Sequence, residues 1–226
     1  MTQPVRVTIE VGPKGKKVIA VAQDWPGLER GAKTEELALE RLQAYLPRYA
    51  PIASLAGMDG EFAANTALNI VEHYPGVGST DFWGISFAFS SIDKQPMSSE
   101  ELERELTLMR ACWSFFDVVR ARVSAEMQKG TRGGGKDRDE IVRHTLYAEL
   151  QWAKMIGVLT PGAEMLTDEG LTAHRAAYCT AIRAYHAQGK PAGKLAKWPL
   201  RYLIRHTAYH ALDHSWEMED KNLVGA

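Results

Sequence analysis

The sequence has little cysteine, almost no net charge and no long apolar run. Its 226 residues include two cysteines, Cys112 and Cys179, and the formal net charge is −1. A near-neutral chain has no basic field with which to hold nucleic acid, so we expect no nucleic-acid partner. No apolar run approaches the roughly 18 to 20 residues that span a bilayer, so we expect no membrane partner either.

The start of the sequence and the two cysteines bear on the cellular compartment. The first residues lack the pattern of a secretory signal, in which a basic start is followed by an apolar stretch and small residues. We therefore expect a cytoplasmic protein in which Cys112 and Cys179 are free thiols rather than a disulfide. Both lie in helical patterns, so we expect them to fill core rather than to act as nucleophiles.

The composition is that of an ordinary globular protein, with 45% hydrophobic and 24% charged residues. The length suits one large domain or two small ones. The spacing of apolar residues changes near residue 96, so we divide the chain into residues 1–92 and residues 96–226. We expect an α+β fold that is mainly α, with a small β-β-α-β module followed by a four-helix bundle.

The first part of the chain has the pattern of strands and one helix. Apolar and polar residues alternate over 5–11, which predicts a strand, and 17–22 is the expected returning strand after a glycine-rich turn. Thr34 is suited to cap a helix, which we expect to end before Pro47. A third strand is expected over 68–73.

From about residue 96, apolar residues recur at three- and four-residue steps, as they do on one face of a helix. Glycine- and lysine-rich connectors separate the helical stretches, at 129–138 and 187–196. The helices are expected over 98–126, 139–157, 167–186 and from 198 onward. Four helices with separating loops indicate a four-helix bundle.

The glycine-rich stretch Gly130–Lys136 matches most of a phosphate-binding loop. In such a loop the next residue is Ser or Thr, which holds magnesium, whereas this chain has Asp137. The loop should also follow a strand, and here a helix is expected before it. We therefore interpret the stretch as a linker.

Three of the seven histidines, His206, His210 and His214, lie four residues apart. On a helix, residues at this spacing share one face and lie about 6 Å apart, so two imidazoles can reach one metal ion. On a helical wheel that takes Leu203 as its reference, the other apolar residues lie to one side, and His210 and His214 fall on the margin of this apolar face and point into the bundle. His206 falls further toward solvent and is a candidate for the rim of the site.

A metal site needs a third ligand, which in a bundle usually comes from another helix. His144 and His174 lie near the starts of the second and third helices, and helical phase cannot choose between them. Glu217 falls beside the pair formed by His210 and His214. Histidines at this spacing are also common as hydrogen-bonded side chains at the margin of a bundle, without a metal.

A long first helix, the opening of the second helix up to His144, and the motif His210-Ala-Leu-Asp-His214 occur in this order. Over about residues 96–222 this resembles the DinB-like superfamily of four-helix bundles. That superfamily commonly binds a divalent metal through one histidine of its second helix and a pair on its last. The resemblance implies His144, His210 and His214 as ligands, and the pair His206 and His210 is an alternative register. The chain departs from the common His-His-Arg-Gly-type ending, because Trp216 and Glu217 follow the motif.

The resemblance also implies a kind of chemistry. Some DinB-like proteins are transferases or isomerases that use small thiols such as bacillithiol or mycothiol. A metal held by three histidines with open positions lowers the pKa of a bound thiol, and zinc, nickel or iron suits such ligands. Glu217 would act at the catalytic centre by accepting the proton or orienting a ligand imidazole. We expect a metal-dependent transferase or hydrolase with a small thiol or another small molecule as substrate.

Residues 4–50 combine a strand, a turn from Asp24 to Gly27 and a helix start at Thr34-Glu-Glu. This is similar to HicB-like modules, which often act as antitoxins by binding a partner. The resemblance supports a second hypothesis, a non-enzymatic interaction module or scaffold with a vestigial metal site. We also expect this module to pack on the bundle or to join two copies of the chain as a homodimer.

Overall fold

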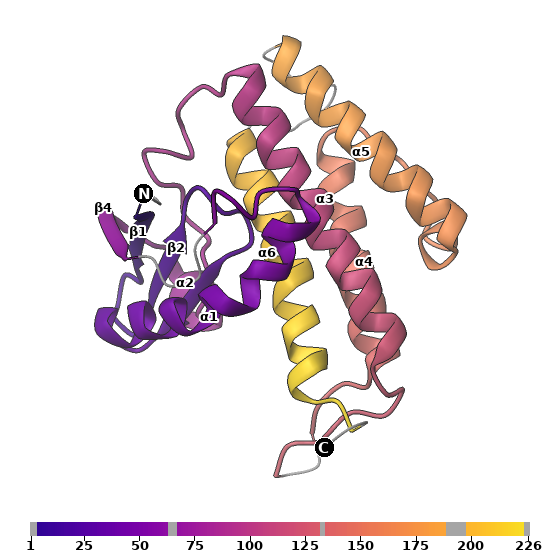
Figure 1. The fold of residues 1–226 in the computed structure, drawn as a ribbon, viewed down its shortest axis with the longest axis horizontal. Coiled ribbons are helices and arrows are strands. Elements are labelled where there is room, and N and C mark those ends of the chain that lie inside the picture. The colour runs from indigo at the N-terminus through magenta and orange to yellow at the C-terminus, as the bar shows by residue number, and fades with distance from the viewer. Residues whose placement is uncertain (1–3, 63–66, 132–133, 189–197, 224–226) are drawn as a thin grey trace.

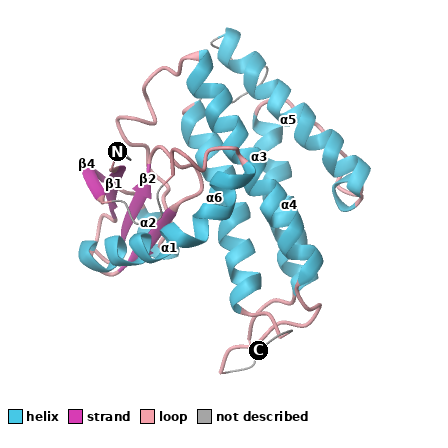
Figure 2. Ribbon diagram, in the orientation of Figure 1, coloured by secondary structure: helices cyan, strands magenta, loops and turns pink. Residues whose placement is uncertain are grey.

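The computed structural model describes residues 4–62, 67–131, 134–188 and 198–223. A small sheet and helix α1 form the N-terminal part, and four long helices dominate the rest (Figures 1 and 2). The fold is therefore α+β and mainly α, which confirms the class expected from the sequence. None of the described helices has both the length and the apolar character needed to cross a membrane.

The sheet contains β1 (Val5–Val11), β2 (Val18–Ala22), β3 (Glu29–Ala32) and β4 (Leu68–Pro75), in the order β3-β2-β1-β4. β1 pairs antiparallel with β2 and parallel with β4, and β2 pairs antiparallel with β3. The sequence predicts β1, β2 and β4. It does not predict β3, because Glu29 and Arg30 are charged yet buried and so break the apolar alternation.

Helix α1 (Glu35–Leu55) begins as predicted, with the side-chain oxygen of Thr34 accepting a hydrogen bond from the backbone N–H of Leu37. The predicted end before Pro47 is wrong, because the helix continues through Pro47 and Pro51. Proline inside a helix removes a backbone hydrogen bond and costs about 3 kcal/mol. The last turns offset this cost because they bury Tyr49, whose hydroxyl donates to the carbonyl of Pro26 at 2.8 Å.

The helical part contains the short α2 (Gly78–Trp83), α3 (Ser99–Arg122), α4 (Arg138–Met155), the 3-10 turn η1 (Glu164–Leu166), α5 (Asp168–Gln188) and α6 (Leu200–Asp220). The four long helices begin within two residues of their predicted starts; Ser98 and Glu101, for example, form a capping box at α3. α3 ends before the predicted residue 126. The predicted connectors 129–138 and 187–196 include residues 132–133 and 189–196, which lie outside the described residues.

Helix α6 occupies the centre of the molecule (Figure 1). It packs against both α3 and α4, while α1 packs between the sheet and α3. Buried apolar side chains from the N-terminal part and from the helices form one continuous cluster. The module therefore packs on the helices, and the division at residues 1–92 and 96–226 stays a prediction.

Charged side chains buried between the sheet and α6 join the two parts. The guanidinium of Arg205, on α6, donates to Glu29 of β3 at 2.8 Å and to Asp93 at 3.1 Å, and all three side chains are almost completely buried. A second link pairs Arg30 of β3 with Asp213 of α6 at 3.0 Å. β3 thus fixes α6 at two points along its length.

A further buried carboxylate organises the segment after β4. Glu10 of β1 accepts hydrogen bonds from the hydroxyls of Ser86, Tyr74 and Thr80, the first at 2.7 Å. It also accepts from the backbone N–H groups of Phe87 and of the next residue. Because these donors satisfy the buried carboxylate, the segment leading to Asp93 is held beside α6.

We expect Arg205→Met to lower the free energy of unfolding by about 3–5 kcal/mol, because Glu29 and Asp93 then remain buried without their cation. Urea unfolding followed by circular dichroism would measure the change. Arg143→Met is the matched control, since Arg143 is exposed, and it should change the free energy by no more than about 0.5 kcal/mol. Equal effects of the two substitutions would contradict the role given to Arg205.

Candidate metal centre

Three imidazoles from two helices come together at one place. His144 projects from α4, and His210 and His214 project from α6. One ring nitrogen of each lies within 4.8 Å of the corresponding nitrogens of the other two. The ring centroids of His210 and His214 are 4.5 Å apart, and each lies about 5 Å from that of His144. The structure thus brings together the three histidines that the resemblance implies.

Helix geometry and packing explain the convergence. His210 and His214 are four residues apart, so they lie one above the other on the same face of α6. α4 packs against α6 along this face and places His144, near its N-terminal end, against both rings. Periodicity supplies the pair, whereas the third ring depends on how two helices pack.

The arrangement is close to what a metal ion requires. Zinc–nitrogen bonds of about 2.0–2.1 Å at tetrahedral angles place ligand nitrogens roughly 3.3 Å apart. The nitrogens here lie within 4.8 Å of one another, so small side-chain rotations would bring them to that spacing. His144 is exposed and the other two rings are partly exposed, so positions on the solvent side are available to a further ligand.

Glu217 holds one of the three rings in place. Its Oε2 lies 2.7 Å from Nδ1 of His214, and its Oε1 accepts from Nζ of Lys221 at 2.5 Å. The hydrogen bond from His214, with the cation of Lys221, lowers the pKa of Glu217 to about 2. A carboxylate this acidic is a weak base, so the geometry favours the orienting role over the proton-accepting one. With Nδ1 engaged, His214 presents Nε2 to a metal.

His210 lies deepest in the cluster. Burial lowers its pKa well below the usual value, and the nearby imidazoles of His214, His206 and His144 lower it further. Its Nδ1 is buried and has no hydrogen-bond partner among the described residues. Burial also lowers the pKa of His144. Neutral rings are the form that binds metal ions, so both side chains suit this use at neutral pH.

The prediction that His206 lies toward solvent is wrong. Its side chain is 3% exposed, and burial lowers its pKa to about 3. The ring stacks on Tyr202 at 5.2 Å and meets Trp152 and Trp198 edge-on. Helical phase alone assigned this side of α6 to solvent. In the structure the N-terminal part of the chain covers it, and the ring of Phe87 packs near that of His206.

An aromatic wall beside the cluster is the feature that sequence reasoning missed. The ring of Trp152, on α4, lies 5.1 Å from His210 and 4.9 Å from His206. Tyr202, His206, His210 and His214 follow one another at four-residue spacing along α6. The four-residue spacing of these rings can be read from the sequence. The packing of Trp152 against two of them cannot, because it depends on how α4 meets α6.

The remaining histidines lie apart from the cluster. His174 is buried, and its Nδ1 lies 2.8 Å from the hydroxyl oxygen of Thr160. Burial lowers the pKa of His174 to about 4. His73 pairs with Glu35 at 3.0 Å, and His186 contacts the carbonyl of residue 97 at 2.7 Å. The geometry therefore selects His144 over His174 as the third ring.

The structure also bears on the cysteines. Cys112 and Cys179 are both free and both buried, which confirms that they are not joined in a disulfide. Burial raises the pKa of each thiol. Neither lies in the histidine cluster, so the cluster is made of nitrogen ligands alone.

Comparisons with known proteins add no relative to this picture. No protein-family model matches the chain, and neither the curated proteins nor the solved structures gave a match. The resemblances to DinB-like bundles and HicB-like modules therefore stay predictions from the sequence. What the fold and the cluster define is an α+β protein, mainly helical, with three converging imidazoles.

The metal-free protein should show the contribution of Glu217 as a dependence of stability on pH. Folding lowers the pKa of Glu217 from 4.5 to about 2, so its contacts stabilise the fold above about pH 4.5 and are lost as the pH falls toward 2. Because the side chain is 29% exposed, we expect a contribution of only about 1 kcal/mol. Urea unfolding of Glu217→Gln should show this loss near pH 6 and no loss near pH 2.

Glu126→Gln provides the matched control, because Glu126 is exposed. It should unfold like the wild type at both pH values. A destabilisation of Glu217→Gln that is the same at both pH values would contradict the charge-dependent contact with His214.

Proposed function

We propose that this protein binds a divalent metal ion through His144, His210 and His214 and is a metal-dependent enzyme that acts on a small thiol. The observation that carries the proposal is the convergence of three ring nitrogens within 4.8 Å, from two helices. The hydrogen bond between Glu217 and His214 supports it further. A carboxylate that orients a ligand imidazole is a common feature of metal sites in proteins.

The donor set fits an ion such as zinc, nickel or iron. Bound there, such an ion would supply a Lewis acid that lowers the pKa of a coordinated thiol. The protein's own residues prepare the site. Desolvation and the neighbouring imidazoles lower the pKa of His210 and of His144, Glu217 orients His214, and Trp152 packs edge-on against His210.

Other expectations from the sequence belong to the same proposal. The transferase or hydrolase chemistry, with a bacillithiol- or mycothiol-type substrate, follows from the resemblance to DinB-like proteins. The cytoplasmic location and the homodimer stay predictions as well. None of them changes which residues would hold the ion.

Purified without a histidine tag, the wild-type protein should contain a stoichiometric divalent metal, measured by mass spectrometry. His210→Ala and His214→Ala should each lose it, because two imidazoles do not hold the ion as three do. His73→Ala is the matched control, since His73 lies outside the cluster. It should keep the metal.

A graded variant sharpens this experiment. Glu217→Gln keeps all three ligands and should weaken metal affinity by roughly 10- to 100-fold. Equally low metal in the wild type and in both histidine variants, even after incubation with zinc or nickel salts, would overturn the proposal.

The thiol part of the proposal has its own test. Adding cysteine, glutathione or bacillithiol to the cobalt(II)-loaded protein should produce the near-ultraviolet charge-transfer absorption of a cobalt-bound thiolate. The S-methyl derivative of the same compound is the control and should produce none, because it cannot form a thiolate. A cobalt-loaded protein that shows no such band with any of the thiols would remove the thiol from the proposal and leave metal binding standing.

One observation favours the second hypothesis, a protein-interaction role for the N-terminal part. Phe82 and Trp83 are 74% and 65% exposed, and their rings pack edge to face at 4.6 Å on α2. Exposed neighbouring aromatic residues are common in interaction surfaces. This second hypothesis predicts that a specific protein co-purifies with the chain and is retained by His210→Ala and His214→Ala.

A further inference from the structure

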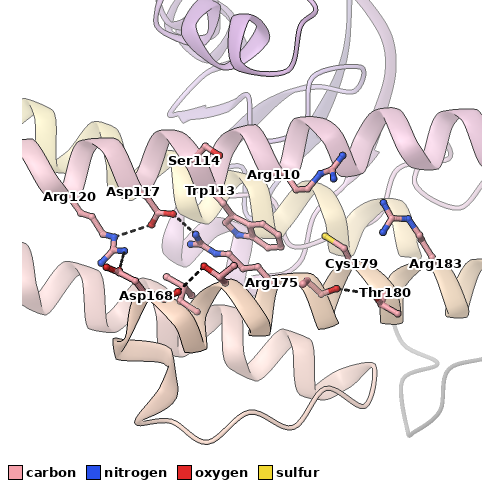
Figure 3. Close-up of a pocket in the computed structure, with 13 residues that line it drawn as sticks. Arg110, Trp113, Ser114, Asp117, Arg120, Asp168, Arg175, Cys179, Thr180 and Arg183 are labelled. Carbon is pink, nitrogen blue, oxygen red and sulfur yellow. Dashed lines mark hydrogen bonds and ion pairs between the residues drawn. The ribbon is translucent and has the colours of Figure 1, made fainter.

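A pocket of about 650 Å³ lies between α3 and α5, away from the histidine cluster. Its walls come from these two helices, which cross the view of Figure 3. None of the residues that line it belongs to the candidate metal centre. The pocket is therefore a separate site, and what it could hold depends on its own side chains.

Charge is balanced at one end of the pocket. Asp117 accepts from Arg120 at 2.9 Å and from Arg175 at 2.7 Å, and Asp168 accepts from Arg120 at 3.2 Å (Figure 3). Arg175 is also bonded to the buried Glu149. These ion pairs leave no spare cation at this end.

The other end carries an excess of positive charge. Arg110 and Arg183 lie at the same end of the pocket as Cys179 (Figure 3). Arg183 is paired with Glu103 at 2.6 Å. Within the described part of the chain, Arg110 forms no salt bridge, and its guanidinium donates to the hydroxyl of Thr107 at 3.1 Å. One guanidinium at this end is thus available to an anion.

The wall between the two ends contains an unsatisfied donor. Trp113 is 3% exposed and lines the pocket, and its indole Nε1 is buried with no acceptor among the described residues. The guanidinium of Arg175 lies 5.0 Å from the centre of its ring. A buried N–H without an acceptor is unfavourable, so an acceptor atom from a ligand would stabilise it.

We propose that this pocket binds a small aromatic carboxylate. The carboxylate pairs with Arg110, because a guanidinium binds a carboxylate in a planar, two-bonded geometry. The ion pair of Arg183 with Glu103 lies beside it. The ring of the ligand lies against Trp113 and Leu171, and the edge of Trp113 supplies a further donor. A planar body suits this wall because aromatic rings pack well on an indole and beside a guanidinium.

Fluorine NMR of para-fluorobenzoate titrated with the full-length protein tests the proposal. The signal should broaden with the wild type, and the neutral para-fluorobenzamide should not respond, because it lacks the charge that Arg110 recognises. Arg110→Gln should weaken benzoate binding roughly tenfold, as expected for loss of a charge-assisted hydrogen bond. Arg143→Gln, the same change at an exposed residue outside the pocket, should bind like the wild type.

Cys179 offers a second readout, because it lines the pocket whereas Cys112 does not. Benzoate should slow the reaction of Cys179 with the uncharged reagent dithiodipyridine in the wild type and not in Arg110→Gln. The Cys179→Ser variant lacks this thiol, so the reaction that it loses is the reaction of Cys179. The proposal is overturned if the wild type does not bind benzoate at millimolar concentration, if the amide binds equally well, or if the two arginine variants bind alike.

Discussion

The buried ion pairs of Arg205 with Glu29 and Asp93 are the constraint on which the arrangement of this protein depends. A guanidinium removed from water is costly, and only carboxylates held at hydrogen-bond distance offset that cost. β3 supplies one carboxylate and the segment after β4 supplies the other, so α6 has one favourable position against the sheet. The pair between Arg30 and Asp213 fixes the same helix two turns further along. Since α6 carries His210 and His214, the sheet positions two rings of the candidate metal centre without contributing a ligand.

Covering α6 from several sides also sets the protonation of its histidines. An imidazolium is disfavoured where water is excluded, and neighbouring imidazoles disfavour it further. His206 and His210 are therefore neutral, and the pKa of His206 lies near 3. The two histidines nevertheless differ in their surroundings and therefore in what they can bind. His206 is enclosed by Tyr202, Trp152 and Trp198, whereas His210 faces two other imidazoles. Position along one helix thus separates a core histidine from a candidate ligand.

The sequence predicted what depends on local periodicity and missed what depends on packing. The three strands, the capped helix starts and the pair His210–His214 follow from spacing and capping chemistry, and all are present. Helical phase could not choose between His144 and His174, because the choice depends on which face of α4 meets α6. The end of α1 at Pro47 and the solvent exposure of His206 were wrong for a related reason: burial against another element outweighed the local preference. β3 was missed because a charged strand is buried only when distant residues pair with it.

The helical part presents two candidate sites, and a side chain of α4 connects them. His144 lies near the start of α4, and Glu149, five residues later, faces the opposite neighbour and binds Arg175 of α5 at 3.1 Å. Arg175 in turn packs over Trp113 in the pocket between α3 and α5. Because Glu149 and Arg175 carry opposite charges, their contact weakens the field that either charge alone would exert on the two sites. His144 of α4 therefore faces the imidazoles of α6, while Glu149 of the same helix contacts Arg175, which lines the pocket between α3 and α5.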